Sequence, residues 1–202
     1  MKTVGFALIA VCYAARPCYS DVLTFENDYQ GFVAAAGPLS FIDFETLPDG
    51  SPSMSGVEIT EDFNYDAQGA HFSAPFPYPF IGGNPNTGFD LRVVHTFEDV
   101  WIIGDLTTPA YAVGAFFPGT TELCAFDEVG SEIACVIYSE PGSGNFVGIV
   151  STDPIHSTTF SRGTNAEAIE SFVFSPVPEP GTLVLIASGA LLLGRRGARR
   201  RE

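Results

Sequence analysis

Residues 121–138 read TELCAFDEVGSEIACVIY, and this stretch has the pattern of a β-hairpin. Two runs with strand character flank a turn centred on Val129 and Gly130. Cys124 and Cys135 lie at equal distances from that centre, so they face each other across the hairpin. In a chain that leaves the cytoplasm, an even pair of cysteines is typical of a disulfide. We therefore predict a Cys124–Cys135 disulfide; the alternative is two free cysteines buried as small apolar residues.

Runs of this kind recur along the chain between turns that contain glycine and proline. The 202 residues include 21 Gly and 15 Pro, and 46% of them are hydrophobic, which is enough for one buried core. Only 16% are charged, which excludes an acidic disordered chain. The runs are residues 39–46, 56–60, 69–74, 89–95, 100–103, 111–117, 121–127, 132–138, 145–151, 155–161 and 168–175. Eleven short runs at this spacing predict an all-β sandwich, and a helix-like stretch at residues 26–36 precedes the strands as a short flank.

The charges are distributed unevenly along the chain. The formal net charge is -15, and between Asp21 and Pro180 there are 23 acids, whereas only Arg92 and Arg162 are basic. Nucleic-acid binding requires clusters of Lys and Arg that release counterions, so we expect no nucleic-acid partner. Cations or neutral polymers are the expected partners. The alternative is that the acids only keep an exported protein soluble.

The first twenty residues have the features of a secretory signal peptide. Lys2 is followed by an uncharged and largely apolar stretch at residues 4–15 and then by a tripeptide that ends at Ser20. The small side chain of Ser20 predicts cleavage after this residue. Lipidation of Cys18 is the alternative, although an arginine and a proline precede this cysteine where small residues would be expected.

The C-terminal 26 residues have three parts in a fixed order. A Val-Pro-Glu-Pro segment is followed by the uncharged run 182–194 and then by a cluster of arginines. The residues are Val177, Pro178, Glu179 and Pro180 in the first part and Arg195, Arg196, Arg199, Arg200 and Arg201 in the last. Their order, spacing and position resemble the PEP-CTERM sorting signal of exopolysaccharide-producing Gram-negative bacteria. As a helix, residues 180–194 would extend about 22 Å, less than the roughly 30 Å of a bilayer's hydrocarbon core. We therefore predict a short transmembrane helix that is a weak anchor, with its arginines in the cytoplasm.

The resemblance implies a route out of the cell. An export translocon would carry the chain across the inner membrane, and an exosortase-type enzyme would recognise the Pro-Glu-Pro segment and process the tail. The protein would then leave its transient membrane anchor for the cell surface or the extracellular matrix; a permanent single-span anchor is the alternative. The predicted organisation is a signal peptide (1–20), a short helical or irregular flank (21–38), a β-sandwich body (39–176) and the sorting signal (177–202).

Several pieces of the body resemble lectin-like and adhesin-like jelly-roll modules, which implies a jelly-roll-like β-sandwich. The pieces are residues 41–50, 109–117, 125–130, 146–149 and 170–174. Many such modules hold a structural Ca²⁺ between acids of the first and last strands. The resemblance therefore implies a calcium site at Asp43 or Glu45 together with Glu170, and no other cofactor is expected.

A second calcium candidate is the triplet Asp62, Asn64 and Asp66. Its spacing matches the first three ligand positions of an EF-hand loop, but the glycine and the bidentate glutamate of such a loop are missing. The alternative is the solvent side of a strand, since alternate residues of an extended chain point to one face.

Residues 72–88 form a stretch in which aromatic residues alternate with prolines, so it is not a central strand. Aromatic side chains on a stiff loop suit the binding of sugar rings, and Phe76, Tyr78 and Phe80 are the candidate ligand-binding residues. The alternative is a loop that closes one end of the core. Trp101, the single tryptophan, lies in an apolar run, and we predict it in the core.

The sequence contains no Gly-x-Ser-x-Gly elbow, phosphate-binding loop or dinucleotide-binding fingerprint. We therefore predict a non-catalytic exported protein with a structural or exopolysaccharide-associated role, which includes carbohydrate binding. One alternative is a small secreted hydrolase of matrix polysaccharide that uses two carboxylates. A second alternative is an ice-binding protein, for which regular rows of threonine would be expected.

Overall fold

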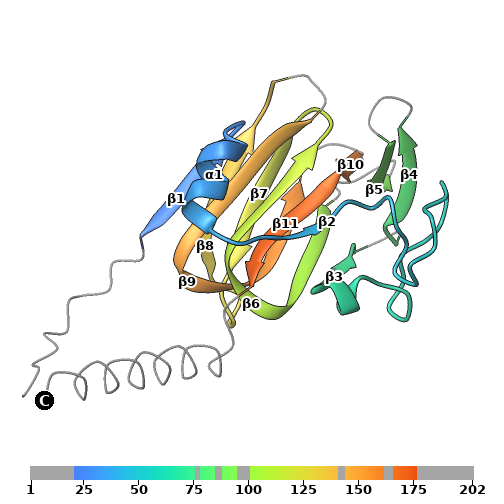
Figure 1. Ribbon diagram of the computed structural model, residues 1–202, viewed down its shortest axis with the longest axis horizontal. Helices are drawn as coiled ribbons and strands as arrows, with labels where there is room; N and C mark the ends of the chain where they lie inside the picture. Colours follow the sequence, from blue (N-terminus) through green and yellow to red (C-terminus); the bar gives the residue numbers. More distant parts are fainter. Residues whose placement is uncertain are drawn as a thin grey trace, which may run out of the picture.

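The computed structural model describes residues 21–75, 78–84, 88–94, 101–140, 144–161 and 166–176, and this part of the chain is all-β, as predicted (Figure 1). The strands are β1 (Val22–Glu26), β2 (Ser40–Ile42), β3 (Ala70–Ser73), β4 (Phe80–Asn84), β5 (Gly88–Val94), β6 (Trp101–Phe117), β7 (Thr121–Phe126), β8 (Glu132–Tyr138), β9 (Asn145–Ser161), β10 (Ala166–Ile169) and β11 (Ser171–Pro176). The helix α1 (Tyr29–Ala36) and a 3₁₀ turn (Asp66–Gln68) accompany them. Neither helical element of the described ranges has the length and apolar character to cross a membrane. The predicted signal peptide and C-terminal helix lie outside those ranges.

Two long antiparallel strands, β6 and β9, run through the whole fold. Their register shifts between Asp105 and Ala110, where both strands bend (Figure 1). On one side of the bend they pair with β11 and β1, and β2 continues beyond β11; we call these strands the first layer. On the other side they pair with β3 and β7, and β8 continues beyond β7; these strands form the second layer.

Aromatic side chains from the two layers meet between them. The ring centroid of Phe172 in β11 lies 5.6 Å from that of Phe72 in β3 and 6.0 Å from that of Phe160 in β9. At the end remote from the bend, Phe117 of the first layer lies 6.2 Å from Tyr138 of the second. The four phenylalanines are almost completely buried. The layers are therefore the two faces of a sandwich whose core is the space between them, as the sequence predicts.

The helix α1 covers the outer face of the first layer. Asp28 caps the helix, because its carboxylate accepts a hydrogen bond of 2.9 Å from the amide of Gly31. Phe32 is fully buried, and its ring centroid lies 5.1 Å from that of Phe146 in β9. This approach requires a glycine below it, since a Cβ at Gly148 would lie 2.6 Å from the Phe32 ring. The helix thus shields this face of the sandwich from solvent.

The N-terminal flank contains a strand that the sequence analysis did not assign. β1 pairs with β9 from Val22–Ser151 to Glu26–Val147, so the sandwich begins before residue 39. The helix begins at Tyr29 rather than at residue 26. Asn27 has a φ of 51°, a left-handed conformation that ends the strand and separates it from the helix.

Other strand boundaries also differ from the prediction. The runs 100–103 and 111–117 belong to the single strand β6, and the runs 145–151 and 155–161 belong to β9. Pro109 and Pro154 suggested interruptions, but both lie where β6 and β9 bend, and a register shift tolerates proline. Residues 56–60 form isolated bridges instead of a strand.

A small second sheet, in the order β10-β5-β4, completes the fold. The strand β4 falls within the stretch predicted as an aromatic loop. It occupies the edge of its sheet, which agrees with the proline that precedes it at position 79. The run 168–175 divides at Glu170 into β10, which belongs to this sheet, and β11, which belongs to the first layer.

Candidate functional site

The outer face of the second layer carries three rows of side chains, and within the described ranges no helix lies over it as α1 lies over the first layer; we call it the open face. Residues that pair directly across neighbouring strands point to the same side, so the register defines each row. The row farthest from the bend contains Trp101, Ser161, Glu122 and Ile137. The middle row contains Ser73, Ile103, Thr159, Cys124 and Cys135. The row nearest the bend contains His71, Asp105, Ser157, Phe126 and Glu132. All of these residues are partly or fully exposed.

The outer faces of the two layers differ in their exposure to solvent. On the first layer, Ala112, Phe146 and Val173 point outward but are buried beneath α1. On the second layer, the rows that alternate with those of the open face point into the core, as fully buried Ile102 and Leu123 show. The sandwich therefore offers one uncovered sheet face among its described strands.

Trp101 lies on this open face, so its predicted place in the core is wrong. The side chain is 37% exposed, whereas the next residue, Ile102, is fully buried. The register explains the difference, because Trp101 pairs with outward-facing Ser161. One sequence signal was available: Asp105 stands four residues later, on the same side of the strand, and a carboxylate is rarely placed in a core.

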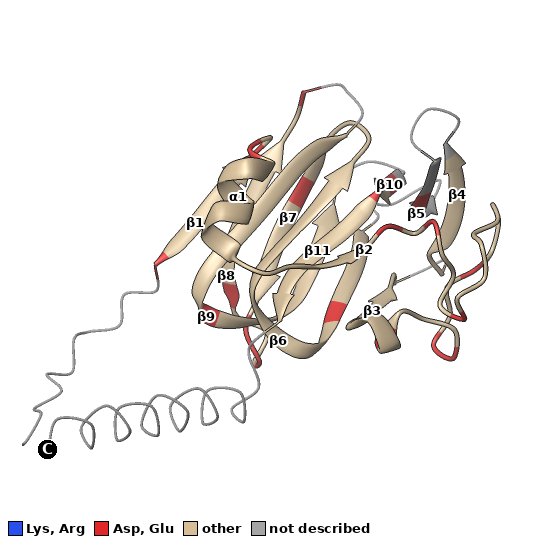
Figure 2. Cartoon of the chain, viewed as in Figure 1, with Lys and Arg blue, Asp and Glu red and all other residues tan. Residues whose placement is uncertain are grey.

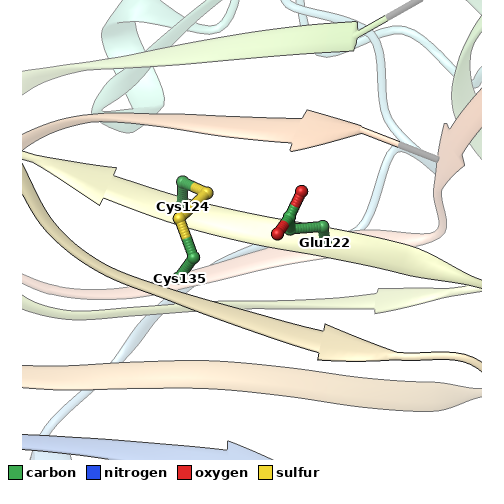
Figure 3. A group of neighbouring side chains, drawn as sticks. All are labelled: Glu122, Cys124 and Cys135. Atoms are coloured by element: carbon green, nitrogen blue, oxygen red, sulfur yellow. A yellow bond between two sulfur atoms is a disulfide. The ribbon is translucent and has the colours of Figure 1, made fainter. Parts of the chain in front are cut away.

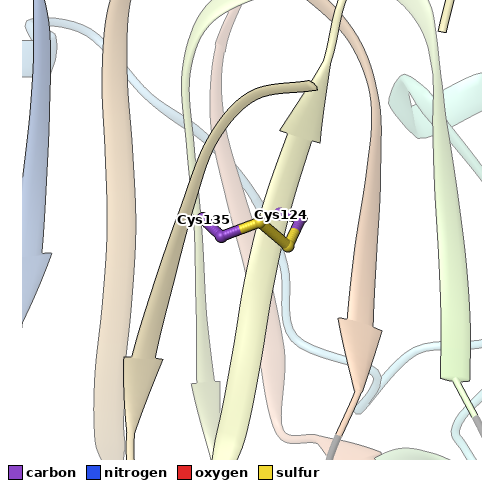
Figure 4. The surroundings of a disulfide bond; sticks show 2 residues. All are labelled: Cys124 and Cys135. Atoms are coloured by element: carbon purple, nitrogen blue, oxygen red, sulfur yellow. A yellow bond between two sulfur atoms is a disulfide. The ribbon is translucent and has the colours of Figure 1, made fainter. Parts of the chain in front are cut away.

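The disulfide predicted from the hairpin is present in the structure. Cys124 of β7 and Cys135 of β8 are direct partners, with 4.1 Å between their Cα atoms (Figure 4). β7 ends at Phe126 and β8 begins at Glu132, so the turn lies where the sequence placed it.

The carboxylate of Glu122 lies beside this disulfide, and the ligand-type atoms of the three residues are within 4.8 Å of one another (Figure 3). A bridged cysteine has no thiolate to offer a metal ion. The arrangement is therefore a carboxylate beside a covalent cross-link. The cross-link holds β7 and β8 in a fixed register.

Acidic groups surround His71 at the other end of the open face. Its Nδ1 lies 3.1 Å from an oxygen of Asp66, and its Nε2 lies 3.6 Å from an oxygen of Glu61. Asp105 is the direct partner of His71 across β3 and β6. Burial raises the pKa of the Asp105 carboxyl, and the nearby His71 offsets part of this effect.

A surface cleft of about 490 Å³ lies beyond the row nearest the bend. Its walls come from the turn between β7 and β8 and from the bend of β9. Four carboxylates and an imidazole line it: Asp127, Glu128, Glu132, Asp153 and His156. Asp127 also stabilises the turn, because its Oδ1 accepts hydrogen bonds from the amides of Val129 and Ser131. Figure 2 shows that acidic positions occur on β6, β7 and β9.

Tyr78 and Phe80, two of the three predicted aromatic residues, are not part of the three rows of the open face. Tyr78 is 57% exposed, and Phe80 begins β4 at the edge of the small sheet. Phe76 lies outside the described residues. A ligand-binding role for these three residues stays a prediction.

The predicted calcium ligands lie around one end of β2 and β11. Asp43 and Glu45 follow β2 and are exposed, and an oxygen of Asp43 accepts a hydrogen bond of 3.0 Å from the amide of Glu45. The backbone amide of Glu170 donates to the carbonyl of Phe116. In the described part of the chain, the residues gathered closely enough to hold a metal are Glu122 and the bridged cysteines, so calcium binding stays a prediction.

The second calcium candidate has a structural role at its central residue. Asn64 is buried, and its Oδ1 accepts hydrogen bonds from the amides of Tyr65 and Phe72 at 2.9 and 2.7 Å. Its Nδ2 donates to the carbonyl of Phe72 at 2.7 Å. The segment is a tight turn rather than the solvent side of a strand, and the side chain of Asn64 ties this turn to β3.

A comparison with protein families identifies the C-terminal motif. The family described as "PEP-CTERM protein-sorting motif" matches residues 176–201. The chain carries a PEP-CTERM sorting motif. The match confirms the resemblance and includes Val177 to Pro180 and all five C-terminal arginines. The PEP-CTERM motif implies an exported protein with a C-terminal membrane anchor that an exosortase processes. No curated protein matches the chain.

Several solved structures of lectin and carbohydrate-binding modules are similar to the chain at a low level. The lectin domain of lectinolysin complexed with Lewis b antigen has a TM-score of 0.37 and 10% identity, and the match covers 44% of this chain and 72% of that one. The family 32 module of C. perfringens NanJ in complex with galactose has a TM-score of 0.36 and 12% identity, and the match covers 52% of this chain and 93% of that one. A family 29 carbohydrate-binding module has a TM-score of 0.36 and 9% identity, and the match covers 72% of this chain and 98% of that one. TM-scores of this size are below those of proteins that share a fold.

Proposed function

We propose that this protein is exported from a Gram-negative bacterium, is processed by an exosortase, and binds glycans at the cell surface or in the extracellular matrix through its open face. It acts as a binding protein and catalyses no reaction. The PEP-CTERM motif supports the export, and the composition of the open face supports the binding. The single observation that carries the glycan proposal is the exposed indole of Trp101 on an uncovered sheet face.

The chemistry of the open face suits a sugar polymer. An indole ring offers a flat apolar surface to the C–H face of a sugar, and the hydroxyls of Ser161 and Thr159 and the carboxylate of Glu122 can hydrogen-bond to sugar hydroxyls. Sites of this kind combine aromatic surface with a few fixed polar groups. Here the polar groups project from paired strands, and the Cys124–Cys135 bridge fixes two of those strands, so the groups are positioned before the ligand arrives.

The first test is retention of the full-length protein, in mild detergent, on the exopolysaccharide of its own host. Trp101→Ala should lower the affinity about thirtyfold or more, since truncation of an aromatic residue that dominates binding removes roughly 2 kcal/mol or more. Tyr111→Ala is the matched control. Tyr111 lies on the same strand and is exposed to a similar extent, 38% against 37%, but it lies beyond the bend, in the first layer.

Two results would contradict the proposal. If Trp101→Ala binds as well as the unaltered protein, the open face is not the binding surface. If the protein releases reducing ends from the polymer, it is a hydrolase, and the non-catalytic assignment is wrong.

A further inference from the structure

We propose that the ligand of the open face is a polysaccharide that carries protonated amino groups, such as a deacetylated amino-sugar polymer. This inference rests on the proposed glycan-binding function and names its ligand class. It follows from the charges of the open face, from the position of Trp101 relative to Glu122, and from the acidic cleft at the end of the face.

The ionisable groups of the open face are acids with one exception. Glu122 lies in the row of Trp101, and Asp105 lies in the row nearest the bend. The exception is His71, which lies against the carboxylates of Asp66 and Glu61. Among the described residues the three rows contain no lysine or arginine, so their carboxylates would repel a polymer of uronates or sulfated sugars.

Trp101 and Glu122 lie on the same face, where neighbouring sugars of one polymer can contact them. Each pairs with Ser161, on opposite sides of β9, so they are separated by two strand spacings, roughly 10 Å between backbones. The carboxylate of Glu122 lies within 4.8 Å of the sulfur of Cys135 on β8 (Figure 3), so the two side chains would meet different sugars of the polymer. A tryptophan face is the best aromatic partner for a cation, and a carboxylate forms a charge-assisted hydrogen bond with an ammonium group. A neutral sugar would use the indole but would leave the charge of Glu122 unmatched.

The acidic surface continues past the bend-side row into the cleft. Glu132, the partner of Phe126 on β8, ends that row and lines the cleft, together with Asp127 and Glu128 of the turn and Asp153 from β9. From the Trp101 row to the Asp105 row the strands extend about 14 Å at roughly 3.4 Å per residue. A polymer with regularly spaced amino groups would therefore meet carboxylates at both ends of the face and in the cleft, whereas a single small cation would use one position only.

The test compares two forms of one backbone, highly deacetylated chitosan and its fully re-acetylated form of equal length. We measure the affinity of the full-length protein in mild detergent for each. The deacetylated polymer should bind more tightly, and its advantage should shrink as salt rises, because salt screens exposed charge pairs. Glu122→Gln should weaken binding of the deacetylated polymer about two- to fivefold, the range expected for one exposed pair, and should weaken binding of the acetylated polymer less, because glutamine keeps a side-chain oxygen that accepts hydrogen bonds from sugar hydroxyls. An unaltered urea midpoint shows that the variant is folded.

Glu26→Gln is the matched control, because Glu26 is an exposed acid on β1, in the first layer. It makes the same change of charge and should leave both affinities unchanged. If Glu26→Gln weakens binding as much as Glu122→Gln, general attraction to an acidic protein explains the result and the inference is overturned.

The outcomes separate this inference from the proposed function. If both polymers bind equally and Trp101→Ala abolishes the binding, the face binds glycans but does not select amino groups, and only the inference is wrong. If neither polymer binds and the host's own exopolysaccharide is not retained either, the proposed function and the inference both fail.

Discussion

The substitution Gly148→Ala tests how α1 covers the outer face of the first layer. Gly148 of β9 lies directly under α1, and a Cβ there would come 2.6 Å from Cδ2 of Phe32 and 2.9 Å from Cε1 of Phe146. Both rings are buried, at 0% and 1% exposure, so neither can move aside into solvent. Carbon atoms pack at roughly 3.5 to 4.0 Å, so the added methyl must displace the helix or distort the strand.

The expected cost follows from this overlap. Overpacking of a closed site by one carbon costs about 1 to 3 kcal/mol in the free energy of unfolding. In a protein of this size, that corresponds to a fall in melting temperature of roughly 2 to 12 °C. Urea unfolding of the purified protein, followed by the fluorescence of its single tryptophan, measures the change.

Gly83→Ala provides the control, since it makes the same change in a strand where space is available. The nearest atom to its added Cβ is the Cβ of Ser55 at 3.5 Å, an ordinary contact. This variant should be as stable as the unaltered protein or slightly more stable. In a Phe32→Ala background, the cost of Gly148→Ala should decrease but not vanish, because the Phe32 ring is gone and the Phe146 ring remains 2.9 Å from the added Cβ. If Gly148→Ala unfolds at the same urea concentration as Gly83→Ala, α1 does not pack closely on this face.

Three further predictions concern the hairpin, the turn before β3 and the open face. Replacing both Cys124 and Cys135 with alanine should lower the free energy of unfolding by about 3 kcal/mol, the loop-closure value for a separation of 11 residues; identical urea midpoints with and without reductant would contradict this. Asn64→Ala should cost about 2 to 4 kcal/mol in thermal unfolding because it leaves buried backbone groups without partners, whereas Asp62→Ala, an exposed member of the same triplet, should cost little. Asp105→Asn should stabilise the protein at pH 7 and have no effect on stability well below pH 3.9. The raised pKa of Asp105 means that folding disfavours its charged form, so the charged carboxyl destabilises the unaltered protein increasingly as the pH rises through the unfolded and then the folded pKa. Equal melting curves of both proteins at pH 7 would contradict this prediction.

Features that depend on neighbouring residues could be predicted from the sequence. The hairpin of β7 and β8 needs only a turn signal and two runs of strand-forming residues, and its register then brings Cys124 opposite Cys135. The PEP-CTERM motif is likewise a local pattern, so its residues were found without a fold. Short-range signals were sufficient in both cases.

Features that depend on distant pairings could not be predicted in this way. The exposure of Trp101 depends on its pairing with Ser161, 60 residues later, and on which outer face α1 covers. The strand β1 lacks a clear alternating pattern and is held by β9, more than 120 residues away. Tertiary contacts decide the conformation of such a segment, since strand propensity is weak and depends on context.

The strand order also determines how an anchored protein would present the open face. The described chain enters the sandwich beside Ser151, where Val22 pairs, and leaves it at Pro176, which pairs with Ala110. Both positions lie next to the bend of β6 and β9, and Figure 1 shows the two ends of the described chain on this side of the molecule. Trp101 lies at the opposite end of the second layer. An anchor that follows Pro176 would therefore join the sandwich at its bent end, at the opposite end of the second layer from the Trp101 row, and removal of the anchor would leave the proposed binding surface unchanged.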